Sequence, residues 1–144
     1  MISDELFDDC VLDHIAVATS DLEKSVGIFS ELGLKFKEAR EVVEEQKVKT
    51  AFAPIDEHAS LELLEPTSDE SPIAKYINKK GAGIHHICFR VKNIELKQSE
   101  LRAKGFQFIY ENTVTGAHDC LVNFIHPRST GGILIELSQP QIKA

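Results

Sequence analysis

The order of hydrophobic and polar residues predicts a strand and then a helix near the start of the chain. The stretch Val11–Ala18 is mostly apolar, and two-residue alternation places His14 on the same face as Ala16. Ser20-Asp21 supplies an N-cap for an amphipathic helix that is expected to stop at Gly33. His14 is therefore expected to project from a sheet.

The same pattern returns 72 positions later, which indicates an internal repeat. His14 is matched by His86 within similar surroundings, whereas Glu62 is matched by Glu136, 74 positions further on. Two residues were therefore gained in between. Other matched positions are Leu22 and Ile94, Gly33 and Gly105, and Phe36 and Phe108.

Each half is predicted to contain a strand, a helix and further strands. The further strands are expected at residues 48–52 and 60–64 in the first half, and at 106–110, 121–125 and 132–137 in the second. Ser71-Pro72 and Gly81 predict the start and the stop of a short linker helix.

These elements predict an α+β fold with two tandem βαβββ modules that form a curved mixed sheet around a metal cleft. Module one is expected at about residues 11–66, the linker helix at about 71–80 and module two at about 83–140, within one domain of residues 1–144. Residues matched by the repeat would face one another across the cleft.

Four side chains are candidates for a metal site. The repeat predicts that His14, Glu62, His86 and Glu136 converge, because each pair is related by the same internal symmetry. Both glutamates interrupt apolar strands, where a carboxylate is costly unless it is paired or metal-bound. Two imidazoles and two carboxylates suit a divalent first-row cation with two open positions, which is typical of a catalytic site.

The other histidines are weaker candidates. His85 neighbours His86 in the sequence and must point to the opposite face of its strand. His58 lies in a polar turn and is expected to be solvated. His118 and His126 flank the strand at 121–125, so either is a candidate for a position at the mouth of the cleft.

Composition and charge narrow the range of functions. Hydrophobic residues make up 42% of the chain and charged residues 27%, so a packed core is expected. The chain has 16 Lys and Arg residues and 23 Asp and Glu residues, and the net charge of −7 argues against a nucleic-acid partner. No apolar stretch is long enough to predict a membrane span. The acidic N-terminal segment does not resemble a secretory signal, so a cytoplasmic location is expected.

Several strings resemble one known family. They are Glu44-Glu45-Gln46, Leu61–Pro66, Asp69–Lys75, Gly83–Cys88, Gly116-Ala117-His118, and Asn123–Pro127 leading into Ser129–Gly132. With the paired layout, they make the chain similar to the vicinal oxygen chelate superfamily, which includes glyoxalase I. Within that superfamily the chain most resembles the methylmalonyl-CoA epimerases, and the resemblance covers nearly its whole length.

The resemblance implies a metal-dependent isomerase that interconverts (R)- and (S)-methylmalonyl-CoA. It makes His14, His86 and Glu136 ligands of a divalent ion and places Glu62 at the fourth ligand position. Cobalt is favoured by the resemblance, and Mn, Ni, Zn, Fe and Mg stay open. Lewis acidity, which stabilises the enolate formed by α-proton abstraction, is the expected main source of catalysis.

Two proton-transfer groups are needed, one on each face of the α-carbon. The resemblance offers Glu136 as one. The family's other carboxylate follows the turn at Glu44-Glu45-Gln46, where this chain has Lys47–Thr50 instead. Glu62 and Glu45 are the two alternatives for the second base.

The resemblance also implies an acyl-CoA substrate and a homodimer. An acidic protein needs local basic groups to bind coenzyme A phosphates, and Lys47, Lys75 and Arg128 are candidates. Two other functions stay open, namely a glyoxalase I-type isomerase and a non-catalytic small-molecule-binding protein of the same fold.

Overall fold

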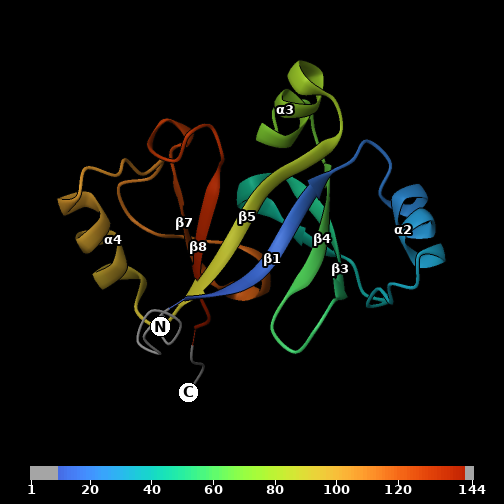
Figure 1. Cartoon of the computed structure of the whole chain (residues 1–144). Coiled ribbons are helices and arrows are strands. Elements are labelled where there is room, and N and C mark those ends of the chain that lie inside the picture. Colours follow the sequence, from blue (N-terminus) through green and yellow to red (C-terminus); the bar gives the residue numbers. More distant parts are fainter. Residues whose placement is uncertain (1–9, 142–144) are drawn as a thin grey trace. The chain divides into compact units, whose positions relative to one another are not determined.

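The computed structural model describes residues 10–141, and contacts within the chain divide it into two compact units (Figure 1). The first-repeat unit is His14–His85, and the second-repeat unit is Met1–Asp13 together with His86–Ala144. Both units begin a new stretch at a matched histidine, so the division follows the repeat. A single domain over residues 1–144 stays a prediction.

The first-repeat unit has the predicted βαβββ order followed by the linker helix. Its elements are β1 (Cys10–Ala18, whose first four residues belong to the other unit), α2 (Leu22–Glu31), β2 (Glu41–Val43), the 3-10 turn η1 (Glu44–Gln46), β3 (Val48–Pro54), β4 (Ser60–Pro66) and α3 (Pro72–Lys80). The strand order is β2-β3-β4-β1, with β1 parallel to β4 and the other pairs antiparallel. The sheet of this unit is therefore mixed, as predicted.

The second-repeat unit has the same order. Its elements are β5 (Gly83–Val91, whose first three residues belong to the other unit), α4 (Ile94–Ala103), β6 (Val114–Thr115), the 3-10 turn η2 (Ala117–Asp119), β7 (Leu121–Ile125), the 3-10 turn η3 (Pro127–Ser129) and β8 (Ile135–Gln139). The strand order is β5-β8-β7-β6, with β5 parallel to β8 and β7 antiparallel to both of its neighbours. The α+β class predicted from the sequence is confirmed.

Helices α2, α3 and α4 each begin at a side-chain N-cap, and the caps at Asp21 and Ser71 were predicted. Asp21 accepts a hydrogen bond from the Lys24 amide at the start of α2, and Asn93 accepts one from the Leu96 amide at the start of α4. Ser71 caps α3 through the amide of Ile73, with Pro72 at the first helical position. A cap of this kind contributes about 1 kcal/mol to helix stability.

A side chain from the last strand of each module also holds the start of its helix. The Leu22 amide donates to Glu65 Oε1 at 3.0 Å, and the Ile94 amide donates to Gln139 Oε1 at 2.8 Å. Each acceptor lies three residues after the predicted glutamate ligand of its own unit. The repeat therefore extends to the connection between helix and strand.

The strand predicted at 106–110 is not formed, and this prediction was wrong. Only Phe108 pairs with Ile125, as an isolated bridge. The Asn123 side chain accepts from the Tyr110 amide and donates to the Tyr110 carbonyl, so a side chain replaces the strand partner that a ladder would need. The short strand β6 takes the edge position in this unit.

Other differences concern strand ends. The sequence did not predict β2, which has only three residues, and the strand expected at 132–137 is observed as Ile135–Gln139. Among the residues that the structure describes, none of the helices combines the length and apolar character of a membrane span. The acidic segment behind the cytoplasmic prediction, residues 1–9, lies outside the described residues.

Candidate metal centre

The first-repeat unit places His14 and Glu62 together on adjacent parallel strands. Glu62 pairs with Ala16 in the register of β1 and β4, so its side chain shares a face with His14, two residues earlier. His14 Nε2 lies 3.5 Å from Glu62 Oε1, and the two side chains are only 7% and 4% exposed. A buried imidazole and carboxylate are thus brought together within this unit.

The second-repeat unit contains the equivalent pair. Glu136 pairs with Cys88 in the register of β5 and β8, two residues after His86. His86 Nε2 lies 3.5 Å from Glu136 Oε1, with side-chain exposures of 5% and 9%. The same separation and burial in both units show that the pair is a property of the repeat.

The donor atoms fit a metal ion. A separation of 3.5 Å exceeds the usual N–H···O range of about 2.7–3.2 Å. Two ligand atoms each about 2.1 Å from a shared ion lie roughly 3.0 Å apart at the right angle of a six-coordinate site and roughly 3.4 Å apart at a tetrahedral angle. Each pair is therefore spaced as two ligands of one ion would be, and a bound cation would offset the cost of burying the carboxylate.

The complete set suits a divalent ion in charge and in ligand type. Two carboxylates balance a charge of two, and imidazole with carboxylate is a donor set that Co, Mn, Fe, Ni and Zn accept. That the two pairs bind one common ion, with open positions for a substrate, stays the prediction made from the repeat.

The remaining histidines have other surroundings. The His85 ring packs perpendicular to Tyr76 at 4.8 Å, as expected for a side chain on the opposite face from His86. His58 is 57% exposed and lies 3.9 Å from Glu57, in agreement with a solvated position. His58 and His85 thus lie apart from the His–Glu pairs.

His126 directly precedes the 3-10 turn η3, and His118 lies within η2. His126 Nδ1 accepts from the Arg128 amide at 3.1 Å and so caps η3. His118 is exposed in η2 with a left-handed φ of 56°. A position for either at the mouth of a cleft stays a prediction.

The two alternatives for the second base differ in exposure. Glu62 is buried beside His14, whereas Glu45 is exposed on η1. The η1 turn is tied to the linker helix, because the Ser71 hydroxyl donates to the Gln46 carbonyl at 3.3 Å. Both carboxylates therefore lie on ordered elements of the first-repeat unit.

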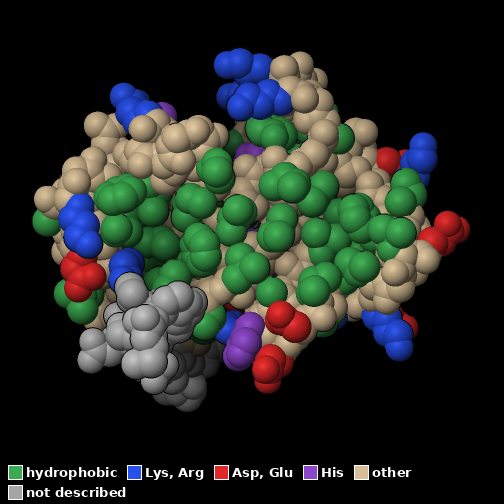
Figure 2. All heavy atoms as spheres, viewed as in Figure 1, with side chains coloured by type: hydrophobic (Ala, Val, Ile, Leu, Met, Phe, Trp, Pro, Cys, Tyr) green, Lys and Arg blue, Asp and Glu red, His purple; other side chains and the backbone are tan. Residues whose placement is uncertain are grey.

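Lys47 and Lys75, two of the basic candidates, lie near Glu70. Lys47 Nζ lies 2.8 Å from Glu70 Oε2, and this hydrogen bond lowers the pKa of the Glu70 carboxyl below its usual value. Lys75 is exposed on α3, over which Lys and Arg side chains gather (Figure 2). Since Glu70 engages Lys47, Lys75 is the better placed of the two to meet an anionic ligand.

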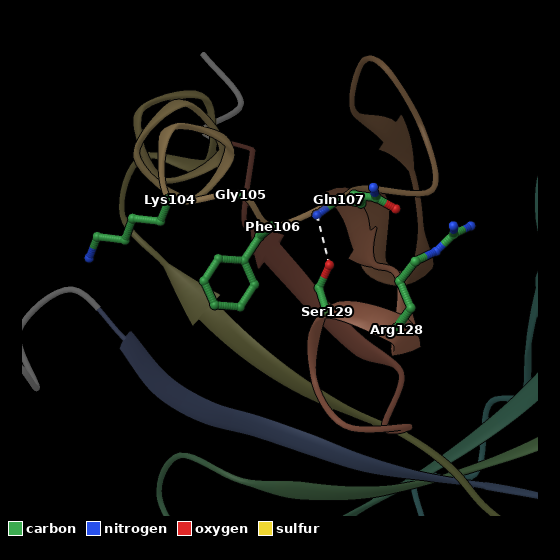
Figure 3. Close-up of a pocket in the computed structure, with 6 residues that line it drawn as sticks. All are labelled: Lys104, Gly105, Phe106, Gln107, Arg128 and Ser129. Atoms are coloured by element: carbon green, nitrogen blue, oxygen red, sulfur yellow. Dashed lines mark hydrogen bonds between the residues drawn. The ribbon is translucent and has the colours of Figure 1, made fainter.

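The third basic candidate, Arg128, lines a surface pocket of about 330 Å³ in the second-repeat unit. Arg128 and Lys104 point away from each other around this pocket (Figure 3). Arg128 donates to the His126 ring, and Lys104 is the C-cap of α4, where free carbonyls disfavour an anion. The pocket includes neither His86 nor Glu136 and is poorly suited to phosphate.

Comparisons with known proteins give consistent results. Residues 13–124 match the model of the glyoxalase/bleomycin resistance protein/dioxygenase superfamily. Human mitochondrial methylmalonyl-CoA epimerase is 38% identical over 130 residues, which cover 89% of this chain and 73% of the human protein.

Two solved structures are similar over most of their length. The methylmalonyl-CoA epimerase of Mycobacterium tuberculosis superposes with a TM-score of 0.86 at 32% identity, covering 91% of this chain and 88% of that one. A methylmalonyl-CoA epimerase in complex with methylmalonyl-CoA and NH4+ gives a TM-score of 0.87 at 31% identity, covering 92% and 95%.

Proposed function

This chain belongs to the methylmalonyl-CoA epimerase family of the glyoxalase/bleomycin resistance protein/dioxygenase superfamily, and we propose that it interconverts (R)- and (S)-methylmalonyl-CoA. The epimerases of this family are isomerases. The observation that carries the proposal is the buried His–Glu pair repeated in both units. Such a pair in each half is what a divalent-metal site built by duplication requires.

In the proposal, His14, Glu62, His86 and Glu136 hold a divalent ion, for which the resemblance favours cobalt. When bound, the ion supplies positive charge that stabilises the negative charge developing on the substrate as the α-proton leaves. The imidazoles contribute neutral donors and the carboxylates contribute the balancing charge.

The carboxylates of the chain carry out the proton transfers. Glu136 accepts the α-proton from one face of the substrate, which breaks the C–H bond. The carboxylic acid form of a second group, Glu62 or Glu45, donates its proton to the opposite face and forms the new C–H bond. Proton exchange with solvent then returns Glu136 and the second group to their starting states. The product then differs from the substrate only in configuration. Glu62 and Glu136 are themselves buried, so few water molecules reach the two carboxylates.

Deuterium exchange tests the reaction directly. With methylmalonyl-CoA in heavy water, we expect the purified protein to incorporate deuterium at the α-carbon and to convert each epimer into the other. It should leave the methylglyoxal–glutathione adduct unchanged. Turnover of that adduct without exchange would favour a glyoxalase I-type isomerase. Substrate binding with neither reaction, in a protein lacking a divalent ion, would favour a binding protein.

The lysines of α3 are proposed to contact the phosphates of the acyl-CoA. The chain has a net charge of −7, so a phosphate-bearing substrate needs a local basic surface, and the exposed residues Lys75, Lys79 and Lys80 provide one. Lys75→Ala should raise KM for methylmalonyl-CoA by roughly 2- to 5-fold, as expected for one exposed charge contact, and leave kcat unchanged.

The salt dependence of KM provides the control for this prediction. The difference between Lys75→Ala and the unmodified protein should shrink as ionic strength rises, because exposed charges are screened. Lys104→Ala, a matched removal of a lysine from the second-repeat unit, should not change KM. An equal effect of both substitutions would contradict a specific role for α3.

The proposal also includes a homodimer and a cytoplasmic location. The homodimer follows from the family resemblance and from the need to cover sheet edges, which β2 and β6 form in their units. The human relative is named as mitochondrial, so the location of this chain is a separate expectation that rests on its own sequence.

A further inference from the structure

Each His–Glu pair is accompanied by a phenylalanine that the repeat also duplicates. Phe52 on β3 pairs directly with Glu62, and Phe124 on β7 pairs directly with Glu136. The two phenylalanines lie 72 positions apart, the same spacing as His14 and His86. The two residues gained by the second half therefore lie between Phe124 and Glu136, in the connection from β7 to β8.

The phenyl rings contact the imidazoles with nearly identical geometry. The Phe52 and His14 rings are perpendicular, at 89°, with centroids 6.1 Å apart. The Phe124 and His86 rings are also perpendicular, at 90°, with centroids 5.6 Å apart. Phe52 and Phe124 are only 7% and 6% exposed. Each ring thus occupies a fixed place beside the imidazole of its own unit.

From this arrangement we infer that Phe52 and Phe124 are positioning residues that hold the His14 and His86 imidazoles in the orientation needed for metal binding. Perpendicular packing restricts rotation of the imidazole about its Cβ–Cγ bond, and that rotation determines where Nε2 points. Restricting it before the metal binds reduces the entropy lost on binding. The inference rests on the proposed function, because it takes both histidines as ligands.

Phe124 is itself held firmly. The buried Asn123 side chain accepts from the Phe124 amide at 2.8 Å and donates to Gln98 and to the Tyr110 carbonyl. The Tyr110 ring packs against Phe124 with centroids 6.3 Å apart. A chain of contacts therefore runs from α4 through Asn123 and Phe124 to His86.

The chain supplies matched controls for these residues. Phe36 and Phe108 are also related by the repeat, one in each unit, but they pack against hydrophobic clusters that include Leu63 and Leu137. By strand alternation these clusters lie on the opposite face of β4 and β8 from Glu62 and Glu136. Replacing any of the four phenylalanines with leucine removes the same ring, from buried positions at Phe52 and Phe124 and from half-buried positions at Phe36 and Phe108. Only the substitutions at Phe52 and Phe124 remove a ring from a proposed ligand.

The test compares the four leucine variants of the full chain. For Phe52→Leu and Phe124→Leu we expect the Kd for Co²⁺, measured by competition with a chelator, to rise by roughly 10- to 100-fold, as for other residues that orient a metal ligand. The ligand-field absorption of the Co²⁺ protein should change, and at saturating Co²⁺ kcat should fall while KM stays the same. Phe36→Leu and Phe108→Leu should lower thermal stability without changing Kd or the spectrum.

Two outcomes separate the inference from the proposed function. If His14→Ala and His86→Ala weaken Co²⁺ binding but Phe52→Leu and Phe124→Leu behave like the controls, the inference is wrong and the metal site stands. If the histidine variants bind Co²⁺ unchanged, the proposed metal site itself is wrong. Should Phe124→Leu fail to fold, Phe124→Met, which fills the space without a ring, gives the same comparison.

Discussion

Glu136→Gln should reduce epimerisation by roughly 10²- to 10⁴-fold, the range expected when a general base is lost. The amide has almost the shape of the carboxylate, so the fold should survive, but the amide cannot accept the α-proton. Because the amide is also a weaker metal ligand than the carboxylate, the comparison is made at saturating Co²⁺. Chiral analysis of methylmalonyl-CoA after incubation with each pure epimer measures the loss. Full activity of the variant would refute the role of Glu136.

Exchange of the α-proton with solvent deuterium then shows which carboxylate acts on which face of the substrate. If two carboxylates act, Glu136→Gln should still exchange the α-proton of one epimer with deuterium but not convert it into the other. Glu62→Gln and Glu45→Gln provide the comparison, since the true second base is the one whose loss shows the opposite epimer preference. Equal exchange of both epimers in every variant would contradict a two-base mechanism.

Removal of the metal is expected to have the second large effect. Dialysis against a chelator should bring turnover to background, and added Co²⁺ should restore it, because the ion supplies the main stabilisation of developing charge. His14→Ala and His86→Ala should lower the metal content found by elemental analysis, since each removes a ligand. The metal should also raise Tm, because it binds the folded chain.

Two other histidines provide the controls. His58 is exposed in a turn, and His85 packs against Tyr76, so His58→Ala and His85→Ala should retain both metal and activity. Full turnover in a chelator-treated protein shown to contain no divalent ion would contradict the proposed site.

The sequence was sufficient to predict the His–Glu pairs because the repeat adds information that no single residue carries. A buried glutamate in one strand has several explanations, whereas matched glutamates and matched histidines at nearly constant spacing have few. Strand alternation then determines the face of each side chain without coordinates. The caps Asp21 and Ser71 could be predicted for a similar reason, since capping depends on neighbours in the sequence.

Features that depend on distant partners were not predicted. The stretch 106–110 has strand-like residues, but the Asn123 side chain hydrogen-bonds both the amide and the carbonyl of Tyr110. These backbone groups are therefore not available to a strand partner. Phe52 and Phe124 share the 72-residue spacing, yet their role is visible only in the register that pairs them with Glu62 and Glu136. The choice between Glu45 and Glu62 depends on where the substrate lies.

The anchoring of each helix start to its last strand has a consequence for folding accuracy. Sliding β8 along β5 by two residues would leave the buried side chains on the correct face, so hydrophobic burial alone penalises that error weakly. The same slip would carry Gln139 away from the Ile94 amide and leave that amide without its side-chain acceptor. Glu65 and the Leu22 amide give the other half the same safeguard. The starts of α2 and α4 thus favour the correct alignment of the strands in their units, independently of any metal ion.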